Sequence, residues 1–331
     1  MKFISATLLI LLIFGRVHGQ NSIPDRFLEG KSVVLISSAP QARPVLNWAQ
    51  LAHEIHPALL EAGGDPVAYY ELEEITISEE VQAGYAAAFS KRLIANLVIL
   101  TRTSSGQVAL HMGTFNGSKS MINPSGNWGM QANTLEALKE NLVNLGKTVK
   151  TKNLLVLDVP EFPSKESVQG MGPSTIGGRF LNRNPLNLDV FKLGIPLSGA
   201  AGETVALNAY RYDMLGKSAA ALEAEQAEEK RGMEKIFQAL YPHQVEYLTT
   251  PKSDAELIRD RVQFVLMRVE AREADLMQSM GLTVDNPEEK TDIVVKYYIK
   301  FLVRNELYIG PVWDAHPNWE TALTQFLNNL K

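Results

Sequence analysis

The chain has 331 residues, of which 45% are hydrophobic, and it has no cysteine and a formal net charge of -5. This composition is typical of a globular protein with a sizeable core, and the mild acidity argues against general nucleic-acid binding. Without cysteine, the chain can form no disulfide, and it offers no thiol nucleophile and no site for a lipid anchor.

The first 19 residues have the pattern of a removable export signal. Lys2 precedes an apolar run from Ile4 to Phe14. Gly19 fits a signal-peptidase cut before Gln20. The run has about a dozen residues, whereas a membrane-spanning helix needs roughly 20. We therefore expect a signal peptide over residues 1–19 and a periplasmic or secreted protein without a membrane span. Its net charge becomes -7 once Lys2 and Arg16 are removed.

Residues 20–160 alternate between short β-branched runs and longer segments of helical periodicity. Because parallel strands need helical crossovers, this alternation predicts an α/β sheet domain with a doubly wound, mostly parallel sheet. A Ser-Ser-Gly turn predicts that one strand is added antiparallel. The expected strands are Ser32–Ser37, Asp65–Leu72, Ala95–Arg102, the antiparallel Gln107–Gly113, and Asn153–Asp158, and the expected helices are Pro44–Ala62, Ser78–Arg92 and Thr134–Val149.

Residues 161–202 are dense in proline and glycine, which predicts a long irregular connection. Residues 203–331 then form a helix-rich α/β part, which packs against the first domain and contributes one or two extra strands. The expected helices are Thr204–Leu240, Asp254–Met280 and Trp319–Leu330, and the expected strands are Val245–Leu248, Ile293–Val303 and Glu306–Ile309.

Polar residues gather where the predicted parallel strands end. In doubly wound sheets, ligands bind outside the carboxyl ends of the strands, so these residues form one candidate edge. Hydroxyls, arginines and carboxylates suit a phosphate or a metal-bound anion, although an ordinary solvated sheet edge has the same composition. The edge residues are Ser37, Ser38, Arg43, Glu71, Glu73, Glu74, Arg102, Thr103, Asp158 and Glu161.

One segment of this edge suggests hydrolase chemistry. Leu154–Glu161 reads as a buried strand with Asp158 at its tip, as a nucleotide hydrolase holds Mg²⁺, and Glu161 is a second catalytic candidate. The nearest phosphate-loop candidate, Gly113–Ser120, has the wrong spacing and no helix after it, so a true P-loop is not expected. The phosphate-binding candidates are Lys119, Arg43, and Arg179 and Arg183 beside a glycine-rich stretch, which also reads as a flexible loop.

The histidines suggest two weaker candidates. His53 and His56 lie one helical turn apart, which allows a metal site, but ordinary helix-surface histidines are the preferred interpretation. Asp314 and His316 suggest an acid/base pair or, preferably, a capped turn before the last helix.

Three segments carry a resemblance to a known family. They are Arg26–Leu35, Leu155–Pro163 and Val303–Gly310, and in them the chain resembles a family of uncharacterised exported proteins of Bacteroidetes. Some members carry the label NTPase. The resemblance implies export and keeps a nucleotide hypothesis open, but it supplies no catalytic residues.

Two function classes follow from the sequence. The first is a binding or envelope-associated protein whose partner is another protein or a small anionic ligand. The alternative is a metal-dependent phosphoester or nucleotide hydrolase that uses Asp158 and Mg²⁺.

Overall fold

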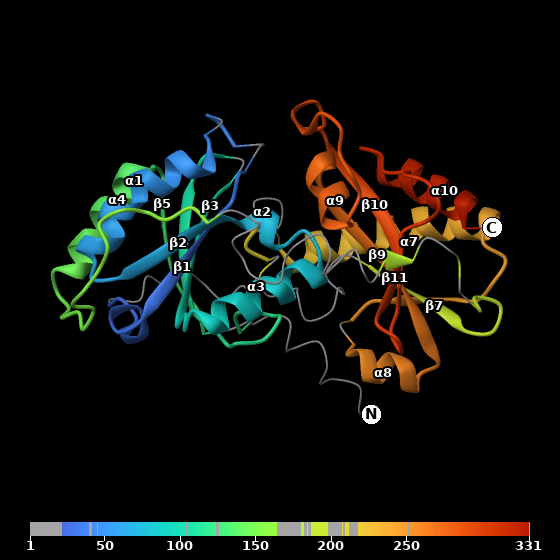
Figure 1. Ribbon diagram of the computed structural model, residues 1–331, viewed down its shortest axis with the longest axis horizontal. Coiled ribbons are helices and arrows are strands. Elements are labelled where there is room, and N and C mark those ends of the chain that lie inside the picture. The colour runs from blue at the N-terminus through green and yellow to red at the C-terminus, as the bar shows by residue number, and fades with distance from the viewer. Residues whose placement is uncertain are drawn as a thin grey trace. The chain divides into compact units, whose positions relative to one another are not determined.

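The computed structural model describes residues 22–39, 42–44, 46–103, 105–123, 126–163, 180–181, 184, 187–197, 207, 209–211, 218–250 and 252–330. The expected signal peptide lies outside these residues. The protein is of the mixed α/β class (Figure 1). Its chain divides into two compact units, Met1–Gln169 with Ala206–Ala219 (unit 1) and Gly170–Val205 with Ala220–Lys331 (unit 2).

Unit 1 contains a five-stranded sheet in the order β2-β1-β3-β4-β5. β1 pairs in parallel with both β2 and β3, while β4 is antiparallel to β3, which confirms the predicted antiparallel addition. β5 is antiparallel to β4 and was not predicted, because its glycine and its short length hide the strand pattern. The strands are β1 (Lys31–Ile36), β2 (Asp65–Glu71), β3 (Asn96–Arg102), β4 (Val108–Thr114) and β5 (Trp128–Ala132).

The helices of unit 1 begin at polar capping residues. Asn47, Ser78 and Thr134 each accept a hydrogen bond from a backbone N–H of the first turn. The caps precede α1 (Trp48–Glu61), α3 (Glu79–Lys91) and α4 (Leu135–Gly146), and a short α2 (Leu72–Ile75) follows β2 directly.

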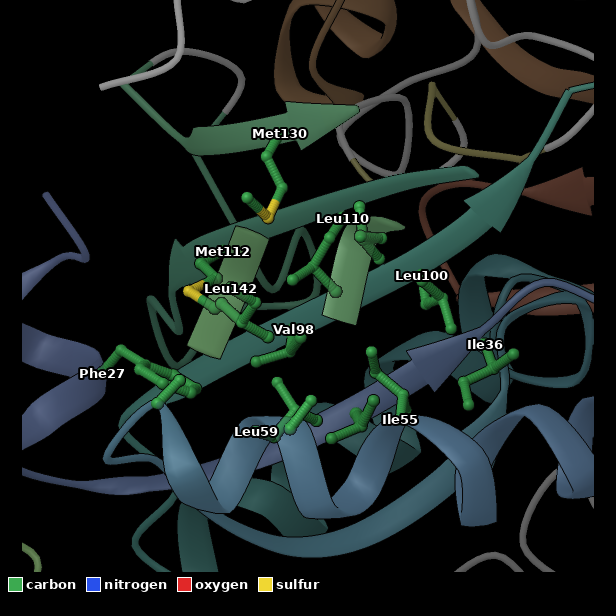
Figure 2. Packing of buried hydrophobic residues seen from close by; sticks show 14 of the residues in the cluster. Phe27, Ile36, Ile55, Leu59, Val98, Leu100, Leu110, Met112, Met130 and Leu142 are labelled. Atoms are coloured by element: carbon green, nitrogen blue, oxygen red, sulfur yellow. The ribbon is translucent and has the colours of Figure 1, made fainter. Parts of the chain in front are cut away.

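The main core of unit 1 lies between the sheet and α1 with α4. Ile55 and Leu59 of α1 lie close to Val98 of β3 in one buried cluster (Figure 2). Burying each such side chain contributes about 1.5–3 kcal/mol to folding. The sequence places Val98 and Leu100 on alternate positions of β3, so Arg102, two residues further, leaves the strand on the same face.

The predicted strand Asn153–Asp158 is not a strand in the structure. Its leucine side chains are exposed, with Leu155 96% accessible and Leu157 74% accessible. Asn153 Nδ2 donates to Gly63 O at 3.0 Å at the start of the segment, and Tyr69 N donates to Glu161 O at 2.9 Å beyond its end. The hydrophobic run suggested a buried strand, but in the part of the chain that the structure describes no neighbouring strand supplies a ladder.

Unit 2 contains a six-stranded sheet in the order β6-β11-β10-β9-β7-β8, which has more strands than the three segments that the sequence indicated. β10 pairs antiparallel with β9 and with β11, and β7 pairs in parallel with β8 and β9. The strands are β6 (Phe180–Leu181), β7 (Lys192–Pro196), β8 (Val245–Leu248), β9 (Val262–Arg272), β10 (Ile293–Phe301) and β11 (Glu306–Tyr308).

The long helix predicted over Asp254–Met280 is wrong. It is split into α8 (Asp254–Arg259), the strand β9 and α9 (Glu273–Ser279). Arg261 has a φ of 66°, a left-handed conformation that ends α8. The β-branched residues then extend between β10 and β7, and this tertiary pairing overrides the helical spacing of the apolar residues.

β7 lies inside the predicted irregular connection. A side chain at Gly194 would place its Cβ 2.8 Å from Val262 Cγ1, so glycine is needed where β7 packs beside β9. The glycine and Pro196 resemble loop composition, which explains why the strand was missed. Two helices cover the sheet core, α7 (Ala219–Leu240) and α10 (Trp319–Asn329), through residues such as Phe237 and Phe326.

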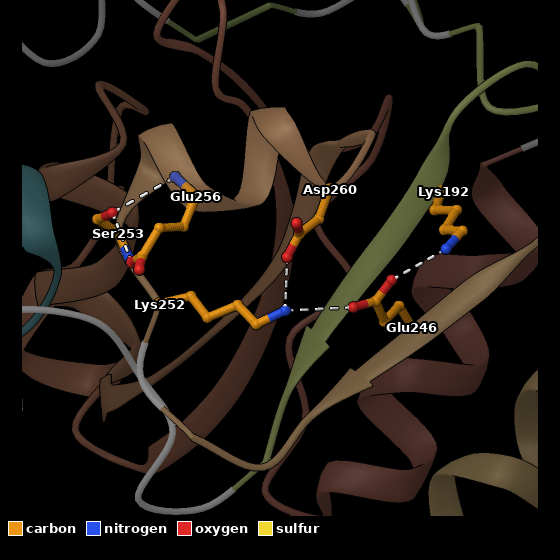
Figure 3. A network of polar contacts seen from close by, with 6 residues as sticks. All are labelled: Lys192, Glu246, Lys252, Ser253, Glu256 and Asp260. Atoms are coloured by element: carbon orange, nitrogen blue, oxygen red, sulfur yellow. Dashed lines mark hydrogen bonds and ion pairs between the residues drawn. The ribbon is translucent and has the colours of Figure 1, made fainter.

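Charges surround the edge strand β8. Glu246 forms ion pairs with Lys192 of β7 at 3.1 Å and with Lys252 at 3.5 Å, and Lys252 also contacts Asp260 at 2.8 Å (Figure 3). Exposed pairs of this kind contribute little stability, but charged side chains on an edge strand oppose pairing with another chain.

β10 confirms a predicted strand but buries its lysines. Lys296 is 0% exposed, and its amine pairs with Asp314 at 2.5 Å and donates to Ile309 O at 2.6 Å. Asn329 of α10 donates to the other oxygen of Asp314 at 3.1 Å. The pair therefore connects the sheet to α10, whereas alternation alone suggested a solvent-facing lysine.

Candidate functional site

The carboxyl ends of β1, β2 and β3 meet at one edge of unit 1, as the sequence predicted. Ser37 follows β1, Glu71 ends β2, and Arg102 ends β3. All three are buried, with exposed fractions of 3% or less. Thr103, the next residue after Arg102, hydrogen-bonds through its hydroxyl to Ser105 at 2.8 Å.

Glu73 joins the ends of two strands. Its carboxylate accepts hydrogen bonds from Ser37 Oγ at 2.5 Å, from Ser38 N at 2.8 Å and from Ser38 Oγ at 3.2 Å. Burial raises the pKa of Glu73, while the two serines and the charge of Arg211 act in the opposite direction. Because Ser37 is completely buried, these contacts hold the loop after β1 and do not present a nucleophile. The neighbouring Glu74 accepts a hydrogen bond from Tyr85 of α3.

Arg102 occupies the opposite face of the same edge. Its Nη1 donates to the carbonyl of Pro44 at 2.7 Å, three residues before the cap of α1. Its Nε and Nη2 are buried and have no hydrogen-bond partner in the part of the chain that the structure describes. Burial lowers the pKa of the guanidinium, which stays cationic at neutral pH. The edge therefore contains a buried positive charge with unused donors.

His111 of β4 is a buried group that sequence reasoning missed. Its ring lies 4.7 Å from the ring of Tyr210, and Asn127 Nδ2 donates to Tyr210 Oη at 2.8 Å. Desolvation lowers the pKa of His111 to about 4, so the imidazole is neutral at physiological pH. Tyr210 and Arg211 come from a segment about a hundred residues away in sequence, and no local pattern signals their return to unit 1.

The predicted metal ligand Asp158 lies on the exposed segment after α4, not at the tip of a buried strand. Its charge acts on the buried His56 and raises that pKa, but less than burial lowers it. Glu161 forms an ion pair with Arg92 at 3.0 Å across two largely exposed side chains. The catalytic roles of both carboxylates remain predictions.

The two phosphate-binding candidates that the structure describes, Lys119 and Arg43, contact different segments of unit 1. Lys119 pairs with Glu79 at the first turn of α3. Beside it, Ser118 N donates to Asn116 Oδ1 of the same loop at 3.0 Å. Arg43 is exposed and its Nη1 donates to Ala42 O at 3.1 Å. Arg179 and Arg183 lie outside the described residues.

The histidine predictions have mixed outcomes. His53 is exposed, but His56 is buried and its Nδ1 lies 2.7 Å from Tyr69 Oη, so the surface interpretation is wrong for His56. The capped turn at His316 is confirmed, because His316 Nδ1 accepts from Asn318 N at 2.9 Å and Asn318 caps α10.

Within the described ranges, no cluster of three or more His, Asp or Glu residues is arranged to hold a metal ion. Among these same residues, no helix is both long and apolar enough to cross a bilayer. Comparisons of the chain with family models, with curated proteins and with solved structures found no match.

Proposed function

We propose that the protein is an exported binding protein that holds a small anionic ligand at the carboxyl edge of unit 1. The observation that supports this is Arg102, a 3% exposed guanidinium with two unpartnered nitrogens. A buried polar group that is left unsatisfied costs about 1–3 kcal/mol, and a charged one costs more. A bound anion would recover that free energy.

The position of Arg102 in the sheet supports the same proposal. β1 leads through α1 to β2 on one side, while β3 pairs with the other side of β1. In a doubly wound sheet, this reversal of strand order is the topological switch point, where ligands bind beyond the strand ends. Arg102 ends β3 at that point, and Pro44, which it contacts, leads into the first turn of α1.

The export signal gives the proposal its compartment. If residues 1–19 are removed, protein isolated from its native cell begins at Gln20 and is recovered outside the cytoplasm. Intact mass measurement of that protein tests the point. A chain that still begins at Met1 in the cytosol would contradict export without affecting the ligand site.

The test of the binding function is the variant Arg102→Met, which keeps the length of the side chain and removes its charge. We expect the ligand-free variant to be at least as stable as the wild type, because an unpaired buried charge is replaced by an apolar group. A panel of small anions should raise the thermal midpoint of the wild type but not that of the variant. Arg304→Met, at an exposed arginine of unit 2, is the matched control.

Two results would overturn the binding proposal. One is a wild-type thermal midpoint that no anion of the panel raises above the chloride control. The other is a strong loss of stability in ligand-free Arg102→Met, because it would assign the guanidinium a purely structural role.

A further inference from the structure

The two free nitrogens of Arg102 lie on one edge of the guanidinium. Nη1 is used by the Pro44 carbonyl at 2.7 Å, which leaves Nε and Nη2 without partners. The N–H bonds of Nε and Nη2 run parallel, so together they form the side-on fork with which arginine binds two oxygens of one planar group. The contact to Pro44 fixes the orientation of this fork.

The single positive charge of Arg102 can be balanced by a ligand with one negative charge. In the part of the chain that the structure describes, no carboxylate pairs with Arg102. Arg43, which directly precedes Pro44 in the sequence, is exposed and lies on the loop after β1. A dianionic phosphate would bring a second negative charge toward an edge that already contains the buried Glu71 and the half-buried Glu73.

The first turn of α1 adds a weaker attraction for an anion. α1 has 14 residues, and its cap Asn47 lies three residues after Pro44, the Arg102 contact. The side chain of its cap Asn47 accepts the N–H of Ala49, and the Asn47 carbonyl accepts the N–H of Leu51. Among the described residues, the N–H groups of Trp48 and Gln50 have no acceptor. The positive end of a helix favours an anion by about 0.3–1 kcal/mol at an exposed site, which supports the arginine without replacing it.

From these observations, we propose that Arg102 binds the carboxylate of a small organic acid through a side-on pair of hydrogen bonds from Nε and Nη2. This inference rests on the proposed binding function and specifies its ligand class. The carboxylate is planar, carries one negative charge and presents two oxygens at the spacing of the two N–H groups. A tetrahedral phosphate can also present two oxygens, but it carries more negative charge than Arg102 balances.

The experiment titrates the purified chain with sodium acetate and sodium benzoate, and in parallel with inorganic phosphate and sulfate, at constant ionic strength set with chloride. Thermal midpoints report binding, and ¹⁵N-edited NMR follows the Nε–H resonance of Arg102. We expect both carboxylates to raise the midpoint and to move the Arg102 Nε–H signal downfield. Phosphate and sulfate should behave like chloride.

Variants assign the effect to the fork. Arg102→Lys keeps the charge but loses the paired N–H groups, and we expect at least a tenfold weaker carboxylate affinity. The matched control Arg304→Lys, at an exposed arginine of unit 2, should stay within twofold of the wild type. If Arg102→Lys does not fold, the Nε–H signal of the wild-type protein decides the question.

The possible outcomes separate this inference from the function beneath it. Binding of phosphate or sulfate but not of carboxylates, abolished in Arg102→Met, overturns the ligand class and leaves the anion-binding function standing. Carboxylate binding that leaves the Arg102 Nε–H signal unmoved, or that Arg102→Lys retains, overturns the assignment to the fork. No response to any of the four anions overturns both proposals.

Discussion

Replacing His111 with glutamine should flatten the acid-side loss of stability. Burial lowers the pKa of His111 from 6.5 to about 4, so the folded protein binds this proton less readily than the unfolded chain does. The neutral ring therefore contributes stability that is fully present above pH 6.5 and is lost as the pH falls through about 4. At about 1.36 kcal/mol per pKa unit, the shift corresponds to about 3 kcal/mol.

The assay is urea unfolding of wild type and His111→Gln at a series of pH values from 7 to 4. The glutamine side chain has no charge over this range, so its cost is constant and the difference between the two proteins isolates the histidine. We expect the wild type to lose about 3 kcal/mol more than the variant between pH 7 and pH 4. His243→Gln removes an exposed imidazole and serves as the control.

The reasoning about His111 fails if the two unfolding free energies stay parallel across this range. Parallel curves would mean that the imidazole charges as easily in the fold as in the unfolded chain. The ring would then be hydrated, and its contact with Tyr210 would not exclude water.

Three further predictions concern stability. Leu155→Ser should change the free energy of unfolding by less than about 0.5 kcal/mol because the side chain is 96% exposed. The matched core change Leu110→Ala should cost about 2–5 kcal/mol. A large cost for Leu155→Ser in urea unfolding would show that the segment packs as a strand. Asp314→Leu should lower the free energy of unfolding by about 3–5 kcal/mol because it leaves the Lys296 amine unpaired in the core. Adding Lys296→Met should restore much of that loss. Equal free energies of unfolding for the single and the double variant would contradict the pairing. Burial raises the pKa of Glu73 above 4.5, so the folded protein keeps this proton more tightly than the unfolded chain. The resulting stability is present below pH 4.5 and is lost as the pH rises through the folded pKa, and the difference from Glu73→Gln in pH-dependent unfolding should show that sign.

The parallel core of unit 1 was predictable because each predicted helix has a local start signal and because β1 and β3 are rich in β-branched residues. The caps at Ser78 and Thr134 act within their own first turns, so neighbouring residues suffice to find them. Arg102 and Ser37 were placed at one edge for the same reason, because parallel strands end together. The unpaired state of Arg102 was not predictable, because it depends on which carbonyls and carboxylates the fold brings near.

Long-range pairing explains the errors. The apolar spacing of Val262, Val265 and Val269 fits a helix, and only the strands on either side show that the segment is extended. The prediction for Leu154–Leu157 is wrong in the opposite sense. Its apolar residues predict a buried strand, but its leucines are exposed in the structure. Tyr210 and Arg211 had no signal, since their role arises from a chain that returns to unit 1.

The return of the chain to unit 1 bears on how the protein is made. During synthesis, the strand that contains His111 leaves the ribosome long before Tyr210 does, so this face of the first sheet stays without its aromatic cover while about a hundred further residues are translated. A fragment that stops before Tyr210 would leave that histidine to water. A single truncation of the chain therefore does not separate unit 1 from unit 2. A fragment designed to contain the whole of unit 1, with Arg102, has to include the residues around Tyr210.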